Sequence, residues 1–195
     1  PTLWWLDTET GDTMPALDTY PAPSHSARFS ANGRWLSFVA APEAGIALYN
    51  FDTGTRRNLD TTAGTPGVWS PDDHSLLYRD RFVDVLHGDE GDDHQNHSHA
   101  YVQSTVLFRY GLDGATIRLS NGSGFDDDGA AWSPDGEWIA FVRARAGVFM
   151  PGQLWLMRAD GSDAHALTQD FDFQHGPPQW SADGRSLLFQ RTNLN

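Results

Sequence analysis

Ala130-Ala131-Trp132-Ser133-Pro134-Asp135-Gly136 is one of four similar segments in the chain, and their repetition determines the architecture. Each segment places an aromatic residue and a serine before a tight turn, and an apolar stretch follows the turn. The other three copies occupy residues 27–33, 67–73 and 178–184. A repeat of about 40 to 60 residues is typical of a propeller, a solenoid or an array.

The apolar stretch after each turn alternates in steps of two residues, which is typical of a β-strand. A second hairpin follows in the first three repeats, and its turns are Asp52-Thr53-Gly54, Leu112-Asp113-Gly114 and Ala159-Asp160-Gly161. The Asn-Gly and Asp-Gly pairs supply the positive φ that tight hairpins require. Each repeat is therefore predicted to be a four-stranded antiparallel meander, with strands a, b, c and d in chain order.

The two ends of the chain complement each other. Residues 3–11 match a strand c and its turn, whereas the fourth repeat stops after strand b at residues 185–190. We therefore predict an all-β propeller of four blades, in which the N-terminal strands complete the last blade and remove its exposed edge. The alternatives are a fragment of a larger propeller, or two chains joined in one eight-bladed ring.

This prediction treats residues 1–195 as a single domain with four blades. Their expected bounds are 24–62 for the first, 63–121 for the second, 122–170 for the third, and 171–195 plus 1–19 for the fourth. The aromatic residues Phe29, Trp69, Trp132 and Trp180 are expected to pack between blades. The serine and aspartate of each turn are expected to hydrogen-bond to the local backbone.

The third repeat resembles the WD40-like (PD40-type) repeat of TolB-like β-propellers. The resemblance rests on Trp-Ser-Pro-Asp-Gly at 132–136, Ile-Ala-Phe at 139–141 and the Leu-Trp-Leu-Met to Leu-Thr ending at 154–168. The other repeats are looser, since Asn32 replaces the aspartate, Asp73 the glycine and Ala182 the proline. The resemblance covers the chain except residues 83–103, and it implies the fold and a periplasmic or extracellular location. It implies little about function, because fold alone does not determine function.

Composition excludes several classes of partner. The net charge is −13, with 26 acidic and 13 basic residues among 195, so nucleic acid and anionic membrane surfaces are unfavourable. No apolar run is long enough to insert into a membrane. Cysteine is absent, which excludes a disulfide framework and a thiol nucleophile. The chain opens at Pro1 without a signal segment, and we expect a processed or trimmed product.

An insertion at residues 83–103 interrupts the second repeat. From the first turn to the c–d turn, this repeat spans 41 residues, against 21 and 25 in the first and third. Four of the eight histidines lie here: His87, His94, His97 and His99. Imidazole and carboxylate groups suit a divalent metal such as zinc, but the spacing is not that of a His-Glu-x-x-His enzyme. The alternatives are a solvated acidic loop and a loop that orders on a partner.

A second candidate site lies where the d–a connections of a propeller meet at the mouth of the central channel. Alignment on the aromatic residue places Asp127 and His175 at one position, and His25 and Asp128 at the next. We predict that His25, Asp126, Asp127, Asp128 and His175 form a binding site there. The three aspartates could also hold Ca²⁺, or could be a solvated acidic rim.

The sequence lacks the motifs of common enzymes, namely a nucleophile elbow, a phosphate loop and a dinucleotide fingerprint. We therefore predict a non-enzymatic, TolB-like interaction module that docks a protein or peptide on its loop face. The alternatives are a metal-binding propeller and an accessory subunit of a larger assembly.

Overall fold

The computed structural model describes residues 3–17, 24–40, 45–62, 64–86, 100–148 and 150–194. Within these ranges the chain is all-β, as predicted. It divides into two compact units, an N-terminal unit (Pro1–Tyr78) and a C-terminal unit (Arg79–Asn195). The same ranges contain no helix that is long and apolar enough to cross a membrane.

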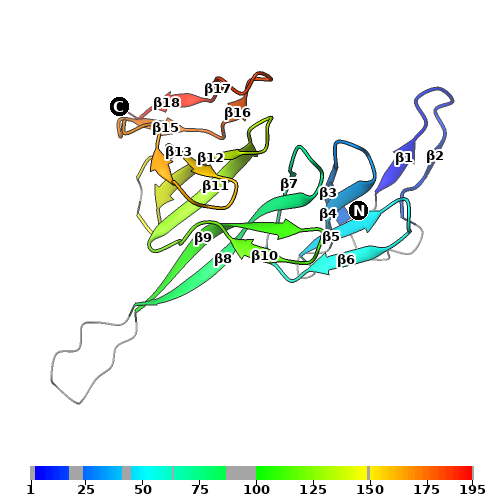
Figure 1. Ribbon diagram of the computed structural model, residues 1–195, viewed down its shortest axis with the longest axis horizontal. Coiled ribbons are helices and arrows are strands. Elements are labelled where there is room, and N and C mark those ends of the chain that lie inside the picture. Colours follow the sequence, from blue (N-terminus) through cyan, green and yellow to red (C-terminus); the bar gives the residue numbers. More distant parts are fainter. Residues whose placement is uncertain are drawn as a thin grey trace, which may run out of the picture. The chain divides into compact units, whose positions relative to one another are not determined.

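The N-terminal unit contains the first repeat as a meander in the order β3-β4-β5-β6 (Figure 1). Its strands are β3 (Ser24–Phe29), β4 (Trp35–Ala40), β5 (Ile46–Asn50) and β6 (Arg56–Leu59). The inner strands carry the core, where Leu36, Phe38, Ala40 and Ala47 are all nearly or fully buried. β4 and β5 are buried on both faces, so the alternation of buried and exposed residues that a two-residue period implies is absent here.

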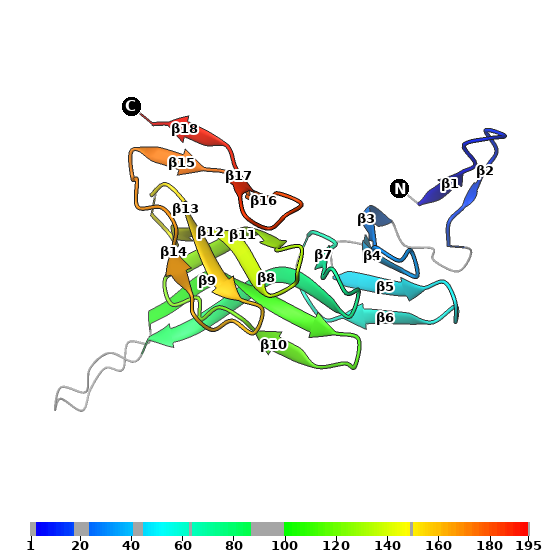
Figure 2. The same cartoon turned by 45° about the horizontal axis from the view of Figure 1, so that its top comes forward.

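The C-terminal unit contains the third repeat in the order β11-β12-β13-β14 (Figure 2). Its strands are β11 (Phe125–Trp132), β12 (Trp138–Arg145), β13 (Gln153–Arg158) and β14 (His165–Ala166). Ile139, Phe141 and Met157 are fully buried and form its core. The predicted four-stranded antiparallel meander is therefore confirmed for this repeat and for the first.

The second repeat is a sheet in the order β10-β9-β8-β7. Its strands are β7 (Val68–Trp69), β8 (Ser75–Leu86), β9 (Ala100–Gly111) and β10 (Thr116–Arg118). The sequence predicted an insertion at residues 83–103 that interrupts the repeat. β8 and β9 extend into both ends of that segment as a long ribbon, because its aromatic and β-branched residues favour strand pairing (Figure 1).

The fourth repeat is broken into two pairs of short strands. β15 (Phe173–His175) pairs with β18 (Arg191–Asn193), and β16 (Gln179–Trp180) pairs with β17 (Leu187–Leu188). The expected unbroken strand at 185–190 was wrong. Pro177 and Pro178 lie between β15 and β16, and proline cannot donate a ladder hydrogen bond. β1 (Trp4–Leu6) pairs with β2 (Thr13–Pro15), and closure of the ring stays a prediction.

The predicted hydrogen bonds from the local backbone to the serine and to the residue two positions later are present in each turn, and the serine hydroxyl also donates to that second side chain. The four bonds are Ser30–Asn32 at 2.9 Å, Ser70–Asp72 at 2.5 Å, Ser133–Asp135 at 2.5 Å and Ser181–Asp183 at 2.6 Å. Each serine also accepts the first backbone N–H of strand b, as in Trp138 to Ser133 at 2.9 Å. Asn32 thus accepts the same serine hydrogen bond as the aspartate that it replaces.

These hydrogen bonds predict a pH dependence of stability. The Ser133 hydroxyl holds the pKa of Asp135 below its ordinary value. A lowered carboxyl pKa stabilises the fold above the unfolded pKa of about 3.9, and this contribution disappears as pH falls through the folded pKa. We expect the difference in Tm between wild type and Ser133→Ala to be larger at pH 6 than at pH 2.5. A difference that does not change with pH in thermal unfolding would contradict this assignment.

Tryptophan side chains link successive repeats. The indole Nε1–H of Trp69 donates to the carbonyl of Arg28 at 3.3 Å, and that of Trp180 donates to the carbonyl of Ala131 at 3.1 Å. Both acceptors come one residue before the aromatic position of the preceding repeat. Packing between blades is therefore confirmed for these two residues.

Asp73 occupies the turn position at which the other three repeats have glycine. Its φ is 60°, in the left-handed region that glycine adopts without steric cost. Its carboxylate accepts hydrogen bonds from the backbone N–H groups of Ala31 at 2.6 Å and Asn32 at 2.8 Å. Asp73 thus links the turn of the second repeat to the turn of the first.

Candidate functional site

The three consecutive aspartates Asp126, Asp127 and Asp128 lie in β11 rather than in a connection before it. They pair with Ala144, Arg143 and Val142 of β12. A bulge follows between Asp128 and Ala131, and Gly129 lies in it with a φ of 61°. A Cβ atom at Gly129 would lie 2.8 Å from the Cβ of Pro177, so no side chain fits there without a shift.

Asp127 is fully buried rather than exposed at a rim. Its two carboxylate oxygens accept hydrogen bonds from Nε and Nη2 of Arg143 at 2.7 and 2.8 Å. The guanidinium carbon also lies 4.5 Å from the ring centroid of Trp155. This two-bond geometry fixes the Arg143 head group, so Asp127 positions an arginine in this structure.

Asp126 and Asp128 face the opposite side of β11, because side chains alternate along a strand. Oδ1 of Asp126 accepts the backbone N–H of Thr105 at 2.7 Å. Oδ2 of Asp128 accepts Nη1 of Arg79 at 2.7 Å, in an ion pair whose side chains are 58% and 39% exposed. Both carboxylates are therefore accessible from one side of the sheet.

His175 of β15 is 2% exposed, and its Nδ1 lies 3.0 Å from the carbonyl oxygen of Gly152. A carbonyl only accepts hydrogen bonds, so we assign the proton to Nδ1. The ring of Phe189 lies 5.3 Å away and holds the imidazole in place.

One cavity of about 390 Å³ brings three of the five predicted residues together, and we call it the acidic cavity. Its described lining residues are Asp126, Asp128, Gly129, Val142, Ala144, Gln174, His175, Gly176, Pro177, Gln190 and Thr192. Two aspartates and one histidine thus line it, with no arginine among those residues. The arrangement suits a cationic group that donates hydrogen bonds.

Two groups of predicted residues remain to be described. His25 lies on β3 of the N-terminal unit, where its backbone pairs with Val39, and its part in the site stays a prediction. The four histidines of the insertion lie outside the described residues, so metal binding there also stays a prediction. Within the described residues no three metal-ligating side chains gather around one point, residues 126–128 included.

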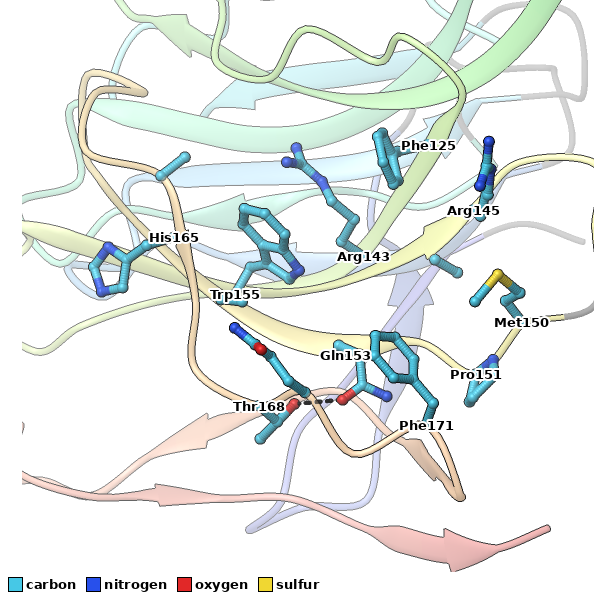
Figure 3. Close-up of a pocket in the computed structure, with 14 residues that line it drawn as sticks. Phe125, Arg143, Arg145, Met150, Pro151, Gln153, Trp155, His165, Thr168 and Phe171 are labelled. Carbon is cyan, nitrogen blue, oxygen red and sulfur yellow. Dashed lines mark hydrogen bonds between the residues drawn. The ribbon is translucent and has the colours of Figure 1, made fainter.

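The structure contains a second cavity, of about 470 Å³, that the sequence did not predict (Figure 3). Phe125, Arg143, Arg145, Trp155 and Phe171 are among its lining residues, and we call it the basic aromatic cavity. The alternation Arg143-Ala144-Arg145 on strand b was a signal that could have indicated it. These residues lie on a strand, whereas the sites predicted from the sequence were in loops and connections between strands.

No protein-family model matches the chain. Among solved structures, the chain is similar to TolB from Acinetobacter baumannii, with a TM-score of 0.62, 19% identity, and coverage of 96% of this chain and 42% of that one. It is also similar to an oligogalacturonate lyase from Vibrio parahaemolyticus, with a TM-score of 0.68, 12% identity, and coverage of 98% and 53%. These likenesses show that the chain has a TolB-like β-propeller fold, as the repeat predicted.

In sequence, the chain is similar to an uncharacterized protein of Agrobacterium fabrum. The two are 30% identical over 148 residues, which cover 67% of this chain and 41% of that protein. The chain therefore spans about two fifths of the length of this relative and of TolB. Of the proteins named here, TolB and the oligogalacturonate lyase share the fold of this chain.

Proposed function

We propose that this chain is a non-enzymatic interaction module that binds a basic segment of a protein partner in the acidic cavity. The observation that carries the proposal is that Asp126, Asp128 and His175 all line one cavity. The TolB-like propeller fold supports a role in protein interaction, and the resemblance favours a periplasmic or extracellular location.

A lysine or arginine side chain fits the chemistry of the acidic cavity. Within the described residues, Oδ2 of Asp126 accepts no hydrogen bond, so it can accept one from an ammonium or guanidinium group. The volume of about 390 Å³ falls in the range of ligand pockets. The net charge of −13 would also steer a basic partner toward the protein and raise the association rate.

A catalytic role has less support. The sequence shows none of the nucleophile or phosphate-binding motifs considered above, and the likeness to the lyase lies at 12% identity. The function that we propose is therefore a non-enzymatic one.

The test uses a short Lys/Arg-rich peptide and a Glu-rich peptide of the same length in isothermal titration calorimetry. We expect the basic peptide to bind, and Asp126→Asn to weaken its binding roughly tenfold, or about 1.4 kcal/mol. Asparagine keeps the Oδ1 acceptor for Thr105 and removes only the charge. The acidic peptide should show no measurable binding.

Asp172→Asn is the matched control, because it removes the same charge as Asp126→Asn. Asp172 is exposed and lies outside the lining of both cavities. Its affinity for the basic peptide should stay within about twofold of wild type, because a rim charge mainly affects the association rate. Equal losses in the two variants would show that general electrostatics, and not the acidic cavity, binds the peptide.

A further inference from the structure

The basic aromatic cavity lies within the C-terminal unit and is built by three strands and the segment around β14. Figure 3 shows Trp155, Arg143 and Phe125 along one side of it, and Phe171, Pro151 and Met150 along the other. Its volume of about 470 Å³ is within the range of small-ligand sites. Nothing in the proposed function uses this cavity.

The charge of this cavity opposes that of the protein as a whole. None of its described lining residues is acidic, although the chain has 26 acidic and 13 basic residues. Arg143 is neutralised by Asp127, so the net positive charge comes from Arg145. Within the described residues, Arg145 has no ion-pair partner. The cavity therefore offers an unpaired cation to an anionic ligand.

Arg143 contributes a fixed donor instead of a net charge. Its Nε and Nη2 groups are bound to Asp127, which leaves Nη1 without a hydrogen-bond partner in the described part of the chain. The indole N–H of Trp155 also donates no hydrogen bond there. Nη1 of Arg143 and the indole N–H of Trp155 are thus donors on residues that line the cavity together with Arg145, and such groups can bind a carboxylate.

The walls are apolar and partly exposed to solvent. Phe125 is 38% exposed, Met150 41% and Phe171 57%, which is unusual for three large apolar side chains around one cavity. Together with the indole of Trp155 they offer an apolar aromatic surface to a flat ring. An aromatic ring would remove this surface from water, while the attached carboxylate reached the donors.

We propose that the basic aromatic cavity binds an aromatic carboxylate, with the ring between Phe125, Trp155 and Phe171 and the carboxylate on Arg145. The same chemistry occurs in a free aromatic acid and in the C-terminal aromatic residue of a peptide. The site is independent of the acidic cavity, which lies on the opposite side of β11 and would bind a cation.

Calorimetric titration of the intact chain with N-acetylphenylalanine, N-acetylphenylalaninamide and 3-phenylpropionate tests the proposal. Both acids should bind at least tenfold more tightly than the amide, which has the same ring without the charge. Binding of N-acetylphenylalanine alone would identify a peptide C-terminus as the ligand, and binding of both acids a free aromatic acid. Binding of the amide as tight as that of the acids would overturn the proposal, as would no binding of either acid.

Variants locate the site. Arg145→Gln should weaken acid binding at least tenfold, whereas Arg185→Gln, an equal charge change outside the cavity lining, should stay within about twofold. Binding should also shift the indole ¹H–¹⁵N resonance of Trp155, assigned with Trp155→Phe. Equal losses in the two arginine variants, or an unshifted Trp155 resonance on saturation with acid, would overturn the assignment to this cavity.

Discussion

Asp127→Ala will lower the free energy of unfolding by about 3 to 5 kcal/mol, the largest effect expected of any single substitution discussed above. The substitution leaves the guanidinium of Arg143, itself 10% exposed, without its anion. A buried charge that loses its partner keeps the full cost of its desolvation. Urea unfolding followed by tryptophan fluorescence measures the change.

The control for this prediction is Asp128→Ala, one residue away in the same strand. Asp128 pairs with Arg79, but that pair is exposed, so its loss should cost only about 0 to 1 kcal/mol. The double variant Asp127→Leu/Arg143→Met removes both buried charges, and it should recover much of the stability lost in Asp127→Ala. Similar losses in Asp127→Ala and Asp128→Ala would show that burial of the pair does not determine its contribution.

Asp73→Ala should have the second-largest effect, a loss of about 2 to 4 kcal/mol. It removes two hydrogen bonds from a carboxylate that is 8% exposed, and it leaves the amides of Ala31 and Asn32 without their acceptors. Alanine at a φ of 60° also adds backbone strain of roughly 1 kcal/mol.

Two further variants at this position separate the hydrogen bonds from the backbone strain. Asp73→Gly removes the carboxylate but suits the positive φ, so it should be less destabilising than Asp73→Ala by about 1 kcal/mol. Asp73→Asn retains one acceptor oxygen and should be the mildest of the three. If Asp73→Gly proved as stable as wild type in urea unfolding, the link between the two turns would contribute nothing.

Local chemistry could be predicted from the sequence, because it involves residues a few positions apart. The bond from Ser133 to Asp135 follows from their spacing alone. The link from Asp73 to Ala31 joins residues 42 positions apart, and the pattern marked Asp73 only as a departure from glycine. The link forms only where the first and second repeats pack against each other, since they are separate sheets.

In the candidate site, too, contacts between residues far apart in the sequence could not be predicted. Alignment of the repeats drew attention to residues 126–128 and His175, and three of these four line the acidic cavity. The alignment could not predict that Asp127 would be buried, because that depends on its register with Arg143 across β11 and β12. The basic aromatic cavity depends on the same register, since Phe125 and Arg145 are paired there.

The hydrogen bonds from tryptophan to the preceding repeat bear on how such a chain can change in length during evolution. The donor indole and the acceptor carbonyl lie at adjacent positions of one short segment, as Trp132 and Ala131 do in the third repeat. A duplicated segment would therefore carry both halves of the connection to its new neighbours, and the join would need no compensating mutation. In the first repeat the acceptor carbonyl of Arg28 is present, but Phe29 has no side-chain N–H to donate. A copy inserted after the first repeat could therefore donate this hydrogen bond to it. If a copy were inserted before the first repeat, Phe29 could not donate the corresponding bond.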